Sequence, residues 1–356
     1  MADFENIINE IIEQLRLQEQ PDLNLETALG LLQTQGVLEE KSITSLLDLA
    51  MTRPVSFLLP VINLGTEMSV ALDDQRIDLA MIKHAKALLK KNKHSQQEVA
   101  IFGSSFNPTT LGHIALIRTL LNQAYDRVRL IPAGQSPLKP ISDYAPITDR
   151  LNLLDMALQS ELKPLERARL WIESIETDRQ PPSSMVITLA ALTVIHQAQE
   201  HYSLILGYDH LAQMDQWYLW ASLQGLCELI FYPREEIDIF TNTHVACLHK
   251  LIEAGIAIKI VFCDAEKKSE FYQYCDQCLP KKALIFDKDA QIVPSSATTI
   301  RAYYKDRAGE QLSPSGLTPE MHHYILSHHL FSNSANITEK KNNKTKDTTQ
   351  IPPGTR

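Results

Sequence analysis

Apolar residues recur at helical spacing through the first quarter of the chain. The clearest set predicts one amphipathic helix and comprises Phe4, Ile7, Ile8, Ile11, Ile12 and Leu15. Similar patterns predict helices over 25–32, 43–51 and 77–89. Their apolar faces could pack on one another, on the following domain or on another protein, and we favour self-packing. Residues 1–95 are therefore expected to form an all-helical N-terminal region, whose role the sequence does not give.

From Val99 onward, short runs typical of strands alternate with helical patterns. Strands are expected at 99–102, 128–131, 203–206, 229–232, 256–262 and 283–286, and helices at 111–123, 149–159 and 185–199. Such alternation predicts an α/β fold, a Rossmann-like doubly wound parallel sheet with right-handed crossovers. Ligands of these sheets bind at the carboxyl ends of the strands.

The domain with this alternation is expected to cover residues 99–331. The last residues, 332–356, are rich in Asn, Lys and Thr and contain few apolar side chains. Because such a segment buries little apolar surface, we expect a disordered tail there.

Composition narrows the possible partners. The 356 residues are 44% hydrophobic and 22% charged, which is typical of a globular protein, and the net charge is −9. This balance argues against long nucleic acid as a partner, although a small phosphorylated ligand needs only a few local cations. An acidic N-terminus, an odd count of five cysteines and the lack of a long apolar run predict a cytoplasmic protein without a membrane partner.

A candidate phosphate site follows the first expected strand. Residues 103–113 read Gly-Ser-Ser-Phe-Asn-Pro-Thr-Thr-Leu-Gly-His. Gly103 permits close approach of the backbone to a ligand, and Gly112 and His113 fall in the first turn of the next helix, whose free N–H groups attract anions. The alternative is a solvent-exposed histidine in a helix cap.

This segment resembles the GxFxPxT/HxGH motif of the nucleotidylyltransferase superfamily, with Thr110, Gly112 and His113 in motif positions. Residues 295–301, Ser-Ser-Ala-Thr-Thr-Ile-Arg, resemble the ISSTxIR-type motif of the same superfamily. Each motif follows an expected strand and precedes a helical pattern. The resemblance implies the nucleotidylyltransferase fold.

Further segments are similar to nicotinate or nicotinamide mononucleotide adenylyltransferases, and the resemblance covers about residues 99–331. Residues 206–220 match the GxD…W element of that family, with Gly207, Asp209 and Trp217 in register. The loop that carries Lys139 and the helix start that carries Arg150 resemble two more of its elements.

The resemblance implies adenylyl transfer from ATP to nicotinate or nicotinamide mononucleotide, by direct attack on the α-phosphate. It implies as catalytic residues His113, Thr110 and Arg301. It implies as ATP-binding residues Gly103, Ser104, Phe106, Gly112, His113, Gly207, Asp209, Ser296, Thr298 and Arg301. It implies as mononucleotide-binding residues Lys139, Trp217, Ser184 and Arg150. Mg²⁺ would accompany ATP without a cage of protein ligands.

Several residues also have ordinary structural interpretations. Trp217 could pack in the core, Asp209 could cap a helix, and Lys139 and Arg150 could be surface cations. Ala297 replaces a serine of the ISSTxIR-type motif. Ser184 and Met185 replace an aromatic residue and a threonine of the family's SYTxxTL segment, which leaves the choice between nicotinate and nicotinamide open.

Two rival functions differ in class. One is nucleotidylyl transfer to another phosphorylated acceptor such as phosphopantetheine. The other is a non-catalytic binding or regulatory protein that keeps the fold and contacts a protein partner, or itself, through residues 1–95. Two smaller expectations concern possible metal ligands. We expect Cys275 and Cys278 to lie on one face of a helix and not to bind a metal ion. We also expect four histidines near the C-terminal end of the domain to be solvent-exposed, namely His322, His323, His328 and His329.

Overall fold

The structure is a computed structural model, and it describes eight stretches of the chain. They are residues 76–92, 96–134, 144–177, 184–233, 241–275, 283–287, 296–306 and 314–332. The helices expected before residue 76 and the tail expected after residue 332 lie outside the described residues.

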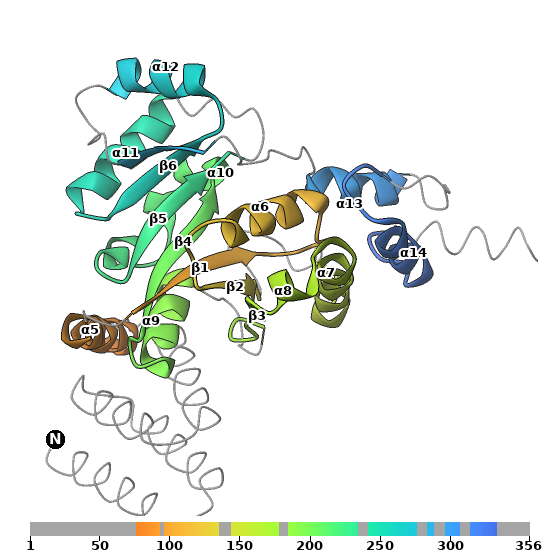
Figure 1. Cartoon of the computed structure of the whole chain (residues 1–356), viewed down its shortest axis with the longest axis horizontal. Coiled ribbons are helices and arrows are strands. Elements are labelled where there is room, and N and C mark those ends of the chain that lie inside the picture. The colour runs from red at the N-terminus through yellow and green to blue at the C-terminus, as the bar shows by residue number, and fades with distance from the viewer. Residues whose placement is uncertain are drawn as a thin grey trace, which may run out of the picture.

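One parallel sheet organises the described residues (Figure 1). Its seven strands are β1 (Gln97–Ser104), β2 (Arg127–Pro132), β3 (Leu170–Ile172), β4 (Glu200–Gly207), β5 (Cys227–Tyr232), β6 (Ile258–Phe262) and β7 (Leu284–Phe286). They lie in the order β3-β2-β1-β4-β5-β6-β7, and each neighbouring pair is parallel. The predicted doubly wound sheet is confirmed.

The strand order reverses between β1 and β4. From β1 the chain adds β2 and β3 on one side, then returns to place β4 against the other side of β1, with Phe102 paired to Ile205. A crevice opens outside the carboxyl ends of the strands at such a reversal, because the connections leave in opposite directions. The fold therefore predicts a ligand site at the carboxyl ends of β1 and β4.

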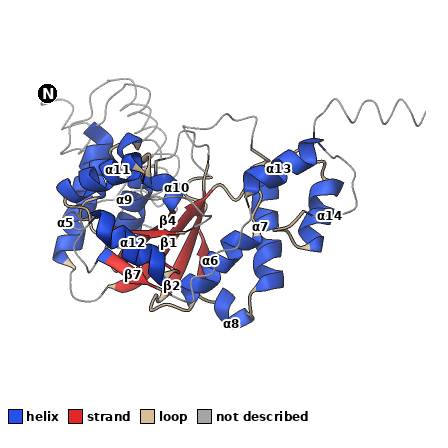
Figure 2. Ribbon diagram, turned by 90° about the horizontal axis from the view of Figure 1, so that it is seen from above, coloured by secondary structure: helices blue, strands red, loops and turns tan. Residues whose placement is uncertain are grey.

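Helices cover both faces of the sheet (Figure 2). Side chains that alternate along β1 enter two apolar clusters: Val99 and Ile101 enter one, and Ala100 and Phe102 enter the other. The helices that contribute buried side chains to the first cluster are α5 (Arg76–Lys91), α9 (Met185–Ile195), α11 (Asn242–Glu253) and α12 (Ala265–Cys275). Those that contribute to the second are α6 (Leu111–Leu121), α7 (Ile147–Glu161), α13 (Ala297–Asp306) and α14 (Pro319–Ser327).

Short helical turns complete the connections. They are α8 (Pro164–Arg167), α10 (Tyr208–Leu211) and the 3₁₀ turns η2 (Met214–Gln216) and η3 (Trp220–Leu223). The last three follow the carboxyl end of β4.

Helix α5 packs on the domain that follows it. Met81, Ile82 and Ala85 are at most 3% exposed and join the same apolar cluster as α9. Helix α9 is buried throughout Val186–Val194, because the sheet lies on one side and α5 covers another. The helix expected over 77–89 is thus present, and its packing on the following domain is one of the alternatives that the sequence left open.

An ion network centred on the buried Arg129 stabilises the sheet. Arg129 of β2 is 1% exposed and donates to both carboxylate oxygens of Glu200, over 3.0 Å and 2.6 Å, and it also contacts Glu173. Tyr202 donates to Glu200 over 3.0 Å. Burial alone would raise the pKa of Glu200, but the hydrogen bonds and the charge of Arg129 outweigh burial and hold that pKa below its ordinary value.

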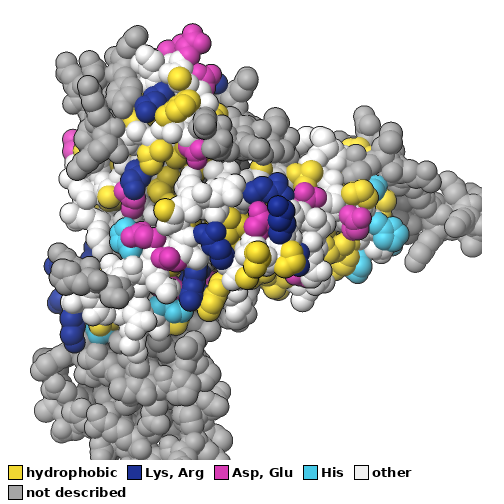
Figure 3. Space-filling model, in the orientation of Figure 1, with side chains coloured by type: hydrophobic (Ala, Val, Ile, Leu, Met, Phe, Trp, Pro, Cys, Tyr) yellow, Lys and Arg dark blue, Asp and Glu magenta, His cyan; other side chains and the backbone are white. Residues whose placement is uncertain are grey.

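The surface carries charges of both signs. On the face shown in Figure 3, Lys and Arg side chains lie among Asp and Glu side chains. Within the stretches that the structure describes, no helix combines the length and the apolar character needed to cross a membrane.

The histidines of the C-terminal helix correct one expectation. His323, His328 and His329 are exposed as expected, but His322 is 7% exposed. Its Nδ1 atom lies 2.6 Å from the hydroxyl of Tyr304 on α13. The expectation of exposure is wrong for His322 because α14 turns this residue toward α13.

Candidate active site

The loop between β1 and α6 is held by the burial of Phe106. This residue adopts a left-handed backbone conformation, with φ of 44°, and is completely buried. Its ring lies 5.7 Å from the Phe102 ring and 5.2 Å from the His113 ring. The side chain therefore supports His113, and any contact of Phe106 with ATP has to come from its backbone.

A capping box fixes the ring of His113. Thr110 is the N-cap of α6, and its hydroxyl accepts the backbone N–H of His113. The backbone N–H of Thr110 donates to Nδ1 of His113 over 3.0 Å. Because a backbone N–H only donates, Nδ1 is an acceptor and the ring proton sits on Nε2. Nε2 lies 3.1 Å from the hydroxyl oxygen of Ser104, so the N–H points to the end of β1.

Thr110 and Gly112 complete this first turn. Thr110 is 1% exposed, and its hydroxyl oxygen lies 2.8 Å from Nδ1 of His113, so it orients the ring. Gly112 occupies the second position of the helix and is half-buried. The N–H of Leu111 donates to the carbonyl of Gly316, which ties the start of α6 to the segment before α14.

Arg301 on α13 reaches the same loop. Its Nη1 donates to the carbonyl of Asn107 over 2.7 Å, and its Nη2 donates to the hydroxyl of Thr298 over 3.2 Å. Ser296 precedes α13, and its carbonyl accepts the N–H of Ile300. The fold thus brings together two motifs that lie far apart in the sequence.

Arg150 ties two strand ends together from beneath the site. It is 4% exposed, and its Nη1 donates to the carbonyls of Ser105 and Ala133, each over 2.7 Å. Its Cζ lies 5.3 Å from the Tyr144 ring, and no carboxylate among the described residues pairs with it. Burial lowers the pKa of Arg150. The interpretation of Arg150 as a surface cation is therefore wrong.

The start of α9 lies against the end of β1. Ser184 is the N-cap of α9 and is half-buried. A Cβ atom on Gly103 would lie 2.5 Å from the terminal carbon of Met185, so the Met185 side chain fills the space beside this glycine. The segment that departs from the family's SYTxxTL pattern thus borders the strand end.

The segment after β4 carries the GxD…W residues. Gly207 ends β4 and is itself the N-cap of α10, while Asp209 lies in the first turn of that helix. Asp209 is therefore not the cap. Trp217 is half-buried against the apolar cluster of α5 and α9, and its ring meets His210 edge to face at 5.7 Å. Core packing accounts for part of its surface.

Two further expectations concern residues that the structure describes only in part or not at all. Lys139 and Cys278 lie outside the described residues, and nothing is described of the Cys275 side chain, so the shared helix face stays a prediction. Among the described side chains, no group of three or more His, Cys, Asp and Glu residues is placed to hold a metal ion.

Sequence reasoning missed the part played by Asn107. This residue is 3% exposed, its carbonyl receives Arg301, and its side-chain oxygen accepts the N–H of Ala145 over 2.9 Å. It therefore joins α13, the start of α7 and the first motif. The only available signal was an asparagine inside a motif loop, because its amide needs hydrogen-bond partners once it is buried.

Comparisons with known proteins agree with this arrangement. The cytidylyltransferase-like family model matches residues 101–302, which is more than half of the chain. This range holds both phosphate motifs and excludes α5.

Relatives of the chain share one description, that of a probable nicotinate-nucleotide adenylyltransferase. The relative from Gloeobacter violaceus is 34% identical over 140 residues, 39% of this chain and 64% of that relative, so the chain spans less than two thirds of its length. A Synechococcus relative is 28% identical over 66% of this chain and 95% of its own length. A Hydrogenobaculum relative is 30% identical over 41% of this chain and 74% of its own length. The chain therefore belongs to the cytidylyltransferase-like family and, within it, to the family of the nicotinate-nucleotide adenylyltransferases.

Proposed function

We propose that this chain transfers the adenylyl group of ATP to nicotinate or nicotinamide mononucleotide, giving deamido-NAD or NAD and pyrophosphate. One observation carries the proposal: Arg301 donates to the carbonyl of Asn107 and so holds the start of α13 beside the loop of His113, at the reversal of strand order. Both helix starts then direct N–H groups at one place, which favours a chain of phosphates.

The chemistry needs positioning rather than proton abstraction. A phosphate oxygen of the mononucleotide forms a bond to the α-phosphorus of ATP, and the bond to the β-phosphate oxygen breaks, so that pyrophosphate leaves with the electron pair. The attacking phosphate is already ionised, so no general base is required. Catalysis then consists of alignment and of donors for the charge that develops on the α-phosphate.

His113 is the donor best placed for that charge. Its Nδ1 is occupied by the capping hydrogen bond from Thr110, which leaves Nε2–H as the donor at the end of β1. The hydroxyl of Ser104 marks where an α-phosphate oxygen would lie. Thr110 acts through His113 by holding the ring.

ATP would lie across the ends of β1 and β4. Arg301 would bind the triphosphate together with the first turn of α13, and Gly207 and Asp209 would bind the ribose. The remaining ATP contacts in this proposal are Gly103, Ser104, Gly112, Ser296, Thr298 and the backbone of Phe106. Mg²⁺ would enter with ATP and bridge its phosphate oxygens, held mainly by the nucleotide and water.

The mononucleotide would lie toward α9 and Trp217. Trp217 would stack on the pyridine ring, and Ser184 would contact the base from the start of α9. Lys139 and Arg150 would attract the phosphate. Arg150 suits this role because its charge is buried without a carboxylate among the described residues.

An acceptor panel tests the proposal. Pyrophosphate release by the full chain is measured with ATP and, in turn, nicotinate mononucleotide, nicotinamide mononucleotide and phosphopantetheine. We expect release with the pyridine mononucleotides and the highest kcat/KM with nicotinate mononucleotide, the substrate class that the relatives' names carry. Higher kcat/KM with phosphopantetheine would identify a different acceptor. No release with any acceptor, while ATP still binds, would favour the non-catalytic alternative.

A further inference from the structure

Helix α5 brings a buried carboxylate to the back of the acceptor end of the site. The helix precedes the residues that match the family, yet its apolar face belongs to the same cluster as α9 and Trp217. Asp78 lies in its first turn and is 1% exposed. A carboxylate so deeply buried is costly unless donors satisfy it.

Tyr218 supplies such a donor. Its hydroxyl donates to Oδ2 of Asp78 over 2.8 Å, although the two residues are 140 positions apart in the chain. A hydrogen bond from a hydroxyl to a charged carboxylate is among the stronger kinds in proteins. It connects α5 to the residue that directly follows Trp217.

The turn that carries Trp217 needs such support. Leu219 has a left-handed backbone, with φ of 50°, which a leucine adopts only at a cost in free energy. Single hydrogen bonds hold the turn locally: Trp217 N–H to the carbonyl of Met214, and Trp220 N–H to the carbonyl of Trp217, each over 3.2 Å. The Asp78–Tyr218 contact anchors the same turn from outside the segment.

We propose that Asp78 is a positioning residue for the mononucleotide: through Tyr218 it fixes the turn that presents Trp217 to the pyridine ring. The inference rests on the proposed function, in which Trp217 stacks on that ring. It gives α5 a direct effect on acceptor binding. Binding of ATP and the transfer step itself are not linked to this contact.

Tyr218→Phe tests the link because it removes only the hydroxyl. We expect the KM for nicotinate mononucleotide to rise about tenfold, which corresponds to about 1.4 kcal/mol. The KM for ATP and kcat stay within about twofold, because the contact acts on the acceptor alone. An unchanged KM for the mononucleotide, or an equal rise for both substrates, would overturn the inference.

Variants of Asp78 separate positioning from general stability. Asp78→Asn keeps an oxygen that can accept from Tyr218, so it should raise the KM for the mononucleotide less than Asp78→Ala does. Adding Tyr218→Phe to Asp78→Ala should raise it no further, because both changes break the same contact. An additive rise would show that the two residues act separately.

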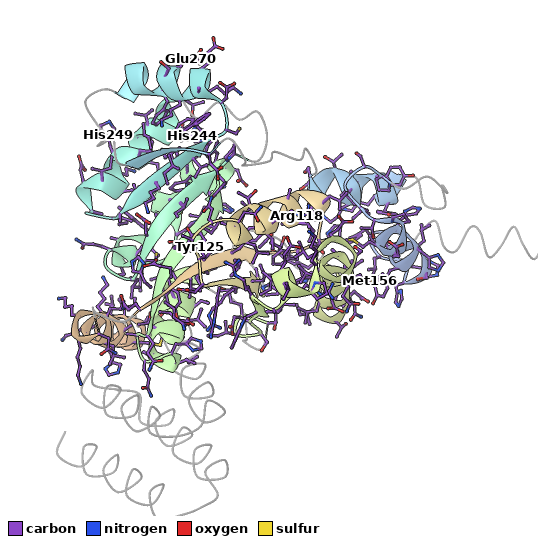
Figure 4. All side chains as sticks on the ribbon, in the orientation of Figure 1. Arg118, Tyr125, Met156, His244, His249 and Glu270 are labelled. Carbon is purple, nitrogen blue, oxygen red and sulfur yellow. The ribbon has the colours of Figure 1, made fainter. Side chains whose placement is uncertain are left out.

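Two control variants match these changes. Tyr125→Phe removes a phenolic hydroxyl from the connection between α6 and β2 (Figure 4). Leu79→Ala shortens a side chain of α5 that is 44% exposed. Both should leave the KM for the mononucleotide unchanged.

A second readout keeps this inference separate from the proposed function. If the wild-type chain turns over nicotinate mononucleotide, the proposed function stands and Tyr218→Phe decides the inference. If it does not, the proposed function fails, and the positional link is measured without substrate from the emission of Trp217, after Trp171 and Trp220 are changed to Phe. Tyr218→Phe should then increase quenching of that emission by acrylamide. Unchanged quenching would contradict the link.

Discussion

Two buried arginines at the same sheet have opposite surroundings. Arg129, in the middle of β2, is 1% exposed and binds the carboxylates of Glu200 and Glu173. Arg150 is 4% exposed at the carboxyl ends of β1 and β2, where its hydrogen bonds go to the carbonyls of Ser105 and Ala133. Both arginines cross-link strands, but only Arg129 is neutralised.

The difference separates stability from function. A carboxylate cancels the field of an arginine, whereas a carbonyl accepts a hydrogen bond and leaves the net charge. Arg301 shows the same pattern as Arg150, since its partners are the carbonyl of Asn107 and the hydroxyl of Thr298. Arg150 and Arg301 therefore keep their positive charge at the carboxyl ends of the strands, whereas the charge of Arg129 holds neighbouring strands together.

The largest effect on stability should follow Arg129→Met. This change leaves the buried carboxylate of Glu200 and the partly buried one of Glu173 without the cation between them, so the free energy of unfolding should fall by about 3–5 kcal/mol, with kcat of the folded protein unchanged. Urea unfolding and pyrophosphate release measure the two quantities. Arg127→Met is the control: Arg127 is 33% exposed and its nearest guanidinium nitrogen lies 3.9 Å from Glu200, so this longer and more solvated contact should contribute less than about 1 kcal/mol. A loss of kcat in folded Arg129→Met would break the separation.

Arg301→Ala, unlike Arg129→Met, should lower activity and leave the stability of the fold nearly unchanged. Losing a charged donor to the triphosphate should lower kcat/KM for ATP by about 10- to 100-fold, equivalent to about 1.4–2.8 kcal/mol. The KM for the mononucleotide and the urea midpoint should change little. Arg118→Ala, in the last turn of α6, provides a matched arginine away from the start of that helix (Figure 4). Equal losses for both substrates would refute a role specific to the triphosphate.

Arg150→Gln sharpens the comparison with Arg129. Glutamine keeps an N–H donor for a strand-end carbonyl but removes the charge, so the KM for the mononucleotide should rise about tenfold. No carboxylate among the described residues is left unpaired, so the loss of stability should be smaller than in Arg129→Met. Initial rates and urea unfolding on both variants test this. Equal losses of stability with an unchanged KM would show that Arg150 is only structural.

The smallest expected effect is on the pH dependence of thermal stability. Because Arg129 holds the pKa of Glu200 below its ordinary value, the pair stabilises the fold fully above that ordinary value and loses its contribution as the pH falls through the lowered pKa. The difference in Tm between wild type and Glu200→Gln should therefore be constant near neutral pH and shrink in acid. A difference that is independent of pH would contradict the assignment.

Much of the fold was predictable because the signals are local. The runs that became β1, β2 and β4 to β7 are apolar and bounded by turns, and the first motif contains its own capping residues in Thr110 and His113. Strand β3 was missed because it has only three residues, of which Trp171 and Ile172 are exposed. Helix α11 was missed although Thr241 caps it and Leu248 and Leu251 lie on its buried face.

The acceptor end of the site could not be predicted in the same way. Its contacts join residues far apart in the sequence: Met185 with Gly103, and Asp78 with Tyr218. The burial of Arg150 likewise depends on two strand ends meeting, which no local pattern encodes. The sequence indicated which residues could act there, and the structure shows which of them are held in place by contacts with distant parts of the chain.

Turnover by His113→Ala tests the central claim, that the chemistry takes place at the carboxyl ends of β1 and β4. His249→Ala, an exposed histidine on α11, is the control (Figure 4). With saturating ATP and nicotinate mononucleotide, the account predicts that kcat of His113→Ala falls by about 10²–10³-fold, the usual loss when one donor to a developing charge is removed. Undiminished turnover in folded His113→Ala would contradict it.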